Sequence, residues 1–154
     1  MMLLLAGLTL IFAGAVASVV LHARAIGDGV FRLAVTAGCV LCGVSAVRVV
    51  LGVTPAALHF DTSVPGGTWV FGLDALSAAF VFVIVLVGGA CAAFGTTYMA
   101  QERGHRAVWF THSIFALLLF ALVLVVTAQA IVPFLVAWEV MAIASFLLIV
   151  TDHE

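Results

Sequence analysis

Five long runs of apolar residues divide this chain, and its polar residues gather between them. Each run holds about twenty residues, enough for a helix rising 1.5 Å per residue to cross a hydrocarbon core of ~30 Å. Backbone groups in lipid must be bonded internally, which favours helices over open sheets. The pattern therefore predicts an all-α integral membrane protein, with helices over the ranges 2–21, 31–53, 75–96, 108–127 and 131–150.

The composition agrees with lipid as the solvent. Of the 154 residues, 66% are hydrophobic and 8% are charged, whereas a typical soluble domain has about 25% charged residues. A water-soluble domain of this size could not bury so much apolar surface. The net charge of -2, with five arginines and no lysine, supplies no basic surface. The expected partner is therefore the lipid bilayer and not a nucleic acid.

The arginines predict how the helices are oriented. Arg24 and Arg32 flank the first loop, and Arg103 and Arg106 lie in the third, whereas the second and fourth loops have no basic residue. The positive-inside rule places the arginine-bearing loops in the cytoplasm of a multi-pass inner (plasma) membrane protein. The N-terminus is then outside and the C-terminus inside. The first apolar run lacks a preceding positive charge and is long, which favours a retained helix over a cleaved signal.

The second loop predicts a small hairpin on the outer side. Apolar and β-branched residues stand on both sides of Pro65-Gly66-Gly67, a combination typical of a tight turn between two strands. Asp74 directly precedes the third predicted helix. A short carboxylate at this position can accept the free N–H groups of the first turn, so we expect Asp74 to be an N-cap.

Small residues predict close helix contacts. Cys39 and Cys42 form a C-x-x-C pair inside an apolar run, a spacing that in a soluble domain could indicate thiol chemistry. Cys42 also belongs to a stripe of small residues at four-residue spacing, which lets two helices approach closely in lipid. Packing is therefore favoured over redox or metal chemistry. The same reasoning applies to Gly88 and Gly89 in the third helix. The members of the stripe are Ala34, Gly38, Cys42 and Ala46.

Glu139 is the strongest candidate for chemistry. It lies eight residues into the fifth apolar run, roughly 12 Å below the outer interface, which is too deep for a short side chain to reach water. A carboxylate at that depth must be protonated, paired or hydrated, and such residues commonly mark an ion or proton path. The alternative is a protonated glutamate that only hydrogen-bonds to a neighbouring helix.

Arg48, His112 and Asp74 are auxiliary polar candidates. For Arg48, reaching the interface or pairing with Asp61 or Asp74 is favoured over a transport role. His112 can exchange protons near neutral pH, although polar side chains are ordinary at helix ends. The sequence has no phosphate-binding loop, no spaced set of metal ligands and no nucleophile–base pair. We therefore expect no cofactor, no metal and no catalytic residue in this chain.

Two segments resemble the antiporter-like membrane subunits. Residues 134–148, FLVAWEVMAIASFLL, are similar to the fifth-helix motif of that superfamily, and residues 73–78, LDALSA, are similar to the opening of its third helix. The superfamily includes the large membrane subunits of complex I, the multisubunit cation/proton antiporters and the membrane subunits of energy-converting hydrogenases. The residues around Asp74 and the ending at 151–154 are most similar to component B of hydrogenase-4-type complexes.

The resemblance implies that Glu139 is a proton-relay group. In the superfamily, the partner of this glutamate is a lysine on the seventh helix, but residues 1–154 hold five predicted helices and no lysine. We therefore expect an N-terminal transmembrane part of such a subunit, a fragment or split product. Its expected partners are the other membrane subunits of the complex and the missing C-terminal part.

Three functions follow from the resemblance. The first is a proton-translocating, non-catalytic subunit of a hydrogenase-4 or NADH-dehydrogenase-like complex, with no redox centre of its own. The second is a piece of a cation/proton antiporter subunit without a redox partner. The third is a structural or assembly module in which Glu139 is idle.

Overall fold

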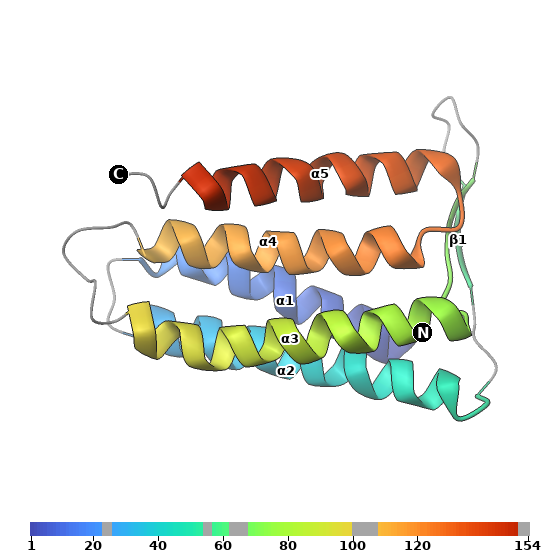
Figure 1. Cartoon of the computed structure of the whole chain (residues 1–154), viewed down its shortest axis with the longest axis horizontal. Coiled ribbons are helices and arrows are strands. Elements are labelled where there is room, and N and C mark those ends of the chain that lie inside the picture. Colours follow the sequence, from blue (N-terminus) through green and yellow to red (C-terminus); the bar gives the residue numbers. More distant parts are fainter. Residues whose placement is uncertain (23–25, 54–56, 62–67, 100–107, 151–154) are drawn as a thin grey trace.

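The computed structural model contains five helices and two short strands in its described residues (Figure 1), which are 1–22, 26–53, 57–61, 68–99 and 108–150. All five helices are long and apolar enough to cross a membrane, which confirms the predicted fold class. The elements are α1 (Met2–Val20), α2 (Gly27–Val50), β1 (Leu58–Phe60), β2 (Trp69–Phe71), α3 (Ala75–Met99), α4 (Val108–Thr127) and α5 (Ile131–Val150).

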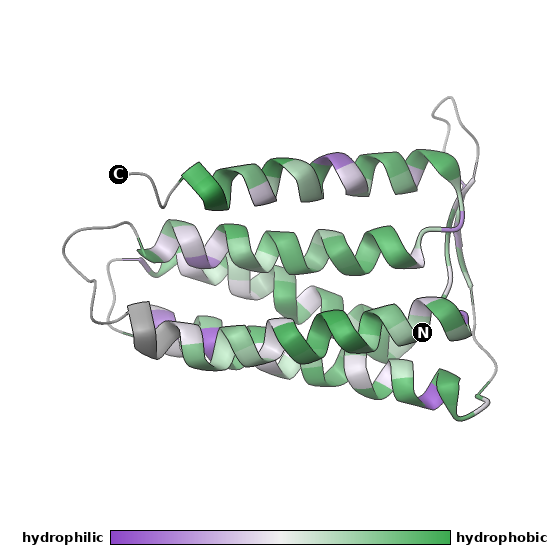
Figure 2. Ribbon diagram, in the orientation of Figure 1, coloured by the Kyte–Doolittle hydropathy of each residue, from purple (hydrophilic) through white to green (hydrophobic). Residues whose placement is uncertain are grey.

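The helices lie side by side with their axes roughly aligned, and consecutive helices run in opposite directions (Figure 1). α2 packs between α1 and α3, α4 packs on α1 and α3, and α5 packs on α4 and touches β2. Apolar residues make up most of every helix (Figure 2), as expected for helices surrounded by lipid and by one another. The C-terminal ends of α1 and α3 lie at one end of the bundle, and the two strands lie at the other end.

The start of α2 differs from the sequence-based expectation by about one turn. The helix begins at Gly27, because the N–H of Val30 already donates to the carbonyl of Ile26, at 3.0 Å. Asp28 lies in this first turn, where the positive end of the helix dipole favours a carboxylate. The expected start at residue 31 was wrong because hydropathy detects the first apolar residue and not the first helical one.

The end of α2 is set by Gly52, whose φ of 94° lies in the left-handed region that glycine adopts readily. The N–H of Gly52 donates to the carbonyl of Val49 and that of Val53 to the carbonyl of Arg48, both at 3.0 Å. These are the two hydrogen bonds of a Schellman motif, which stops a helix. α2 therefore ends at Val50 and not at residue 53 as expected. The other ends differ less: α1 stops at residue 20 and α3 extends to residue 99.

The small-residue stripe of α2 faces α1. A Cβ atom added to Gly38 would lie 2.7 Å from the carbonyl oxygen of Gly7 and 2.7 Å from Cγ1 of Ile11. A Cβ atom added to Gly7 would overlap the sulfur of Cys42, and both Cys39 and Cys42 are buried free thiols. The predicted helix contact is therefore confirmed, because the two backbones approach too closely for larger side chains.

The adjacent glycines of α3 separate two different helix contacts. A Cβ atom on Gly88 would overlap the side chain of Leu119 in α4, and one on Gly89 would lie 3.2 Å from Cβ of Cys39 in α2. α3 is thus held closely on two sides, as its small residues predicted. We name the packed region of α1, α2, α3 and α4 the glycine seam region.

The two strands form the expected antiparallel pair, with Leu58 opposite Phe71 and Phe60 opposite Trp69. The predicted turn at residues 65–67 lies outside the described residues. The predicted orientation, with the N-terminus outside, stays a prediction of the arginine distribution, since residues 24, 103 and 106 also lie outside them.

The strand pair is attached to the link between α4 and α5. The N–H of Gly72 donates to the carbonyl of Thr127, and the N–H of Gln129 donates to the carbonyl of Val70, both at 2.8 Å. Phe71 forms an isolated bridge with Ala128. Residues far apart in the sequence thus close this end of the bundle, and they fix the point at which α5 starts.

Candidate functional site

Glu139 lies on the exposed side of α5. The helix buries only Pro133, Ala137 and Ala144, the face that packs on α4. Glu139 follows Ala137 by two residues, about 200° around a helix with 100° per residue. Its carboxylate therefore points away from α4, and its neighbour Trp138 is 50% exposed.

The cation that would pair with Glu139 is not supplied by the described part of this chain. No ion pair or hydrogen bond of the Glu139 carboxylate is found among residues 1–22, 26–53, 57–61, 68–99 and 108–150. The sequence also has no lysine. A carboxylate on an uncovered face of a membrane-length helix faces lipid, water or a segment of another protein.

His112 occupies a very different environment. It is 4% exposed, and its ring stacks on Phe31 of α2 with the centroids 4.3 Å apart and the planes 6° from parallel. Its Nδ1 atom lies 3.7 Å from a carboxylate oxygen of Asp28, whose side chain is 27% exposed. The histidine is therefore a contact between α4 and the first turn of α2 and not a polar side chain on the surface.

Asp28 was missed by the sequence analysis as a site residue. It stands between two glycines, and Gly27-Asp28-Gly29 is typical of a loop. The signal that could have found it is the pairing of a first-turn carboxylate with an intramembrane histidine. To predict that these two side chains meet, one must know how α2 and α4 are rotated about their axes.

Serine hydroxyls extend the polar contacts at this end of the bundle. Ser18 of α1 donates to the carbonyl of Trp109 at 2.9 Å. Ser113 donates to the carbonyls of Trp109, at 2.8 Å, and of Ala15, at 3.2 Å. Hydrogen bonds between helices in lipid contribute about 0.6–2 kcal/mol each. Together with the Asp28–His112 contact they fix the beginning of α4 against α1 and α2.

Arg48 lies near the opposite end of the bundle. Its side chain is exposed, two residues before the end of α2, so the guanidinium can reach the interface as expected. The alternative pairing with Asp61 or Asp74 is not present among the described residues, where the ion pair found is that of His112 with Asp28. Asp61 instead accepts the hydroxyl of Thr68 at 3.3 Å.

Asp74 is the N-cap of α3. A carboxylate oxygen accepts the backbone N–H of Ser77 at 2.7 Å, as the sequence predicted. This hydrogen bond holds the pKa of Asp74 below its usual value because it favours the charged carboxylate. Asp74 therefore has a local structural role at the start of a helix.

The four polar candidates do not form one site. Glu139 points away from the bundle, His112 points into it, and Arg48 and Asp74 stand at separate helix ends near the strands. In the part of the chain that the structure describes, no three His, Cys, Asp or Glu side chains come together as metal ligands. Among the described residues, Glu139 is the candidate that lies on the side of a membrane-length helix away from its packing partner.

No protein-family model matches the chain. The chain is similar to a protein described as an antiporter subunit, mnhA2, from Staphylococcus saprophyticus subsp. saprophyticus, with 34% identity over 80 residues. That alignment covers 52% of this chain and 10% of the relative, so the chain spans about a tenth of the relative's length. The similarity and the five apolar helices together support an antiporter-like, multi-pass membrane subunit.

Proposed function

We propose that this chain supplies the intramembrane proton-binding carboxylate, Glu139, of an antiporter-like, ion-translocating membrane assembly. The observation that carries the proposal is the position of Glu139. It lies roughly 12 Å from the start of α5, at the depth of lipid, and on the side of the helix away from α4. A carboxylate there has a cost of several kcal/mol unless it is protonated, paired or hydrated.

The proposed mechanism uses a cation that approaches Glu139 and withdraws. A positive charge within a few ångströms favours the ionised carboxylate, because Coulomb attraction is strong where water is excluded. Withdrawal of that charge favours uptake of a proton. The alternation couples movement of the cation to proton binding. The chain has no lysine, and none of its arginines pairs with Glu139 among the described residues, so in this proposal the cation comes from a partner segment or another membrane subunit.

Two more specific assignments are supported by different observations. The residues LDALSA at 73–78 and the ending at 151–154 support a hydrogenase-4 or NADH-dehydrogenase-like complex. The similarity to an antiporter subunit supports a cation/proton antiporter. Purification of the tagged chain from its native membrane separates them: hydrogenase or dehydrogenase subunits would co-purify in the first case, and small antiporter subunits in the second.

The test of the proton-relay role is Glu139→Gln in the complete assembly. Glutamine keeps the shape and hydrogen bonding of glutamate but cannot ionise. We expect at least a tenfold loss of proton transport, measured with a pH-sensitive dye in inverted membrane vesicles, since one lost ionic contact of 1.4 kcal/mol already gives that factor. Leu135→Gln, one turn earlier on the exposed side of α5, is the matched control and should transport normally.

The same experiment identifies a purely structural role. Native gel electrophoresis should show that Glu139→Gln assembles like the parent protein. Assembly with unchanged transport would reduce Glu139 to a hydrogen-bonding group and would favour the assembly-module function.

A further inference from the structure

A groove lies between α2 and α3 and combines apolar walls with one charged side chain. It has a volume of about 580 Å³, and its walls are almost entirely apolar. Arg48 is the one charged residue among its described lining residues. Gly43 and Ala90 are small lining residues, and the groove is open at Gly43, where an added Cβ atom would meet Val85 alone, at 3.4 Å.

The groove runs parallel to the helices, from the middle of α2 towards its C-terminal end. Its lining on α2 extends from Thr36 to Arg48, about 18 Å along the helix. One leaflet occupies about half of the ~30 Å hydrocarbon core. The apolar part of the groove therefore matches the depth of one leaflet, and Arg48, two residues before the end of α2, lies at the level of the headgroups.

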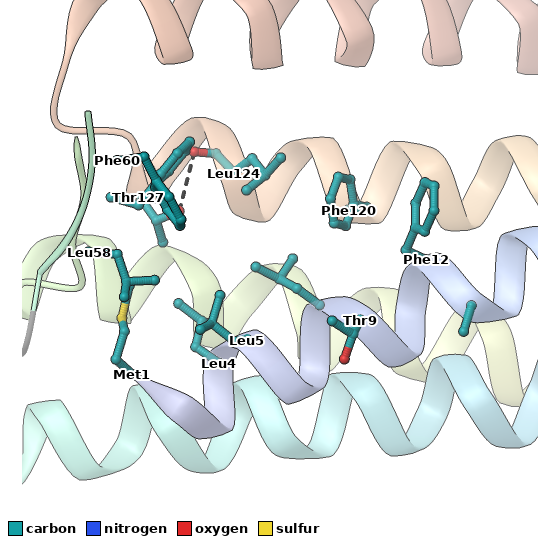
Figure 3. A pocket seen from close by; sticks show the side chains of 13 residues that line it. Met1, Leu4, Leu5, Thr9, Phe12, Leu58, Phe60, Phe120, Leu124 and Thr127 are labelled. Atoms are coloured by element: carbon teal, nitrogen blue, oxygen red, sulfur yellow. Dashed lines mark hydrogen bonds between the residues drawn. The ribbon is translucent and has the colours of Figure 1, made fainter. Parts of the chain in front are cut away.

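A second apolar groove provides a comparison, because no described charged side chain lines it (Figure 3). It lies between α1, the strands and α4, has a volume of about 390 Å³, and none of its described lining residues has a charged side chain. Both of its threonine hydroxyls bond within their own helices: Thr9 donates to the carbonyl of Ala6, at 2.9 Å, and Thr127 donates to the carbonyls of Val123, at 2.8 Å, and Leu124, at 3.3 Å. The side chains that line that groove therefore offer no guanidinium or ammonium group to a phosphate.

We propose that the groove between α2 and α3 binds an anionic phospholipid, with an acyl chain against the apolar walls and the phosphate on Arg48. A guanidinium offers parallel N–H donors that match phosphate oxygens. The guanidinium is exposed and has no ion pair among the described residues, so its charge is available to the phosphate. Exposed Val40, Phe82 and Leu86 form walls with which an acyl chain can pack.

Native mass spectrometry of the whole chain in detergent tests this proposal, with phosphatidylglycerol and phosphatidylcholine as the added lipids. The parent chain should prefer phosphatidylglycerol. Arg48→Gln should lower the affinity for phosphatidylglycerol about fivefold, the factor that corresponds to ~1 kcal/mol for one basic residue near an anionic surface. Arg48→Lys should keep most of the preference. Arg32→Gln, which removes an exposed arginine at the other end of α2, should leave the preference unchanged.

A second pair of variants tests the acyl-chain position. Ala90→Phe fills the groove from an exposed position, and it should reduce the number of tightly bound lipids. Ala79→Phe, at an exposed position of α3 that does not line the groove, should not. Equal binding of the two lipids to the parent chain, or equal effects of Arg48→Gln and Arg32→Gln, would overturn the headgroup assignment. Unchanged lipid binding in Ala90→Phe would overturn the position of the chain.

Discussion

α2 and α5 are both long apolar helices, but they are covered very differently. α2 packs on both α1 and α3, and its contact with α1 is so close that a methyl group added to Gly38 would strike backbone atoms. α5 packs on α4 and leaves Trp138 and Phe146 exposed. The contrast shows which contacts this chain makes with itself and which surface is left for lipid or another protein. Glu139, the candidate relay group, lies on the side of α5 that no other helix of the chain covers.

The difference follows from the residues at the contacts. Helix association in lipid depends on close packing and on interhelical hydrogen bonds, since apolar surface gains little by leaving lipid. α2 has small residues at four-residue spacing, which give close packing. The outward side of α5 has large apolar side chains around one carboxylate, which pack on acyl chains or on a partner with a complementary shape.

The largest effect is expected for Gly38→Leu, which should prevent the bundle from folding. Even Gly38→Ala should cost about 1–3 kcal/mol, the usual range for overpacking, because its Cβ would lie 2.7 Å from the carbonyl oxygen of Gly7. Gly29→Ala, in the same helix with nothing within 4 Å of an added Cβ, should gain up to about 1 kcal/mol. Unfolding in mixed micelles, followed by circular dichroism, measures all three. Equal stability of the two alanine variants would show that α1 and α2 pack less closely in the glycine seam region than the structure indicates.

A smaller effect, about 1–2 kcal/mol, is expected for His112→Leu. This change removes the contact with Asp28 and the polar part of the stack on Phe31, and interhelical polar contacts in lipid reach about that size. His59→Leu, at an exposed side chain of β1, is the control and should have little effect. A double-mutant cycle with Asp28→Asn isolates the pair. A coupling energy near zero would mean that His112 contributes through packing alone.

Asp74→Ala should have an effect of about 0.5–1 kcal/mol, the cost of losing an exposed N-cap. Because the hydrogen bond from Ser77 lowers the pKa of Asp74 in the folded chain, its stabilisation is present above pH ~4 and is lost as the pH falls through the lowered pKa. The stability difference between the parent and the variant should therefore narrow in acid. A difference that stays constant from pH 7 to pH 3 would exclude the charged N-cap as its cause.

The smallest effect on stability is expected for Glu139→Gln in the isolated chain, within about 0.5 kcal/mol, as for exposed positions generally. Ala137→Gln is the matched contrast. It places the same side chain two residues earlier, against α4, where Ala137 is 3% exposed, and should cost about 1–3 kcal/mol. A loss above 1 kcal/mol for Glu139→Gln would show that the carboxylate has a structural partner within this chain.

The sequence by itself determined the five helices, the strand pair and the N-cap at Asp74. These features depend on local patterns: hydrophobic length, the distribution of polar residues and the chemistry of one residue at a helix start. The end of α2 was predicted three residues late, although Gly52 is visible in the sequence, because an apolar run does not show where the backbone turns left-handed.

Only the tertiary structure decided which residues meet. Segments far apart in the chain meet where Asp28 contacts His112 and where β2 attaches to residues 127–129. The outward position of Glu139 likewise depends on which side of α5 packs on α4. They depend on the rotation of each helix about its axis. A helix that is apolar on every side has almost no amphipathic signal to fix that rotation, so it is set by the shape of the neighbouring helices, which the glycine contacts of α1, α2 and α3 determine.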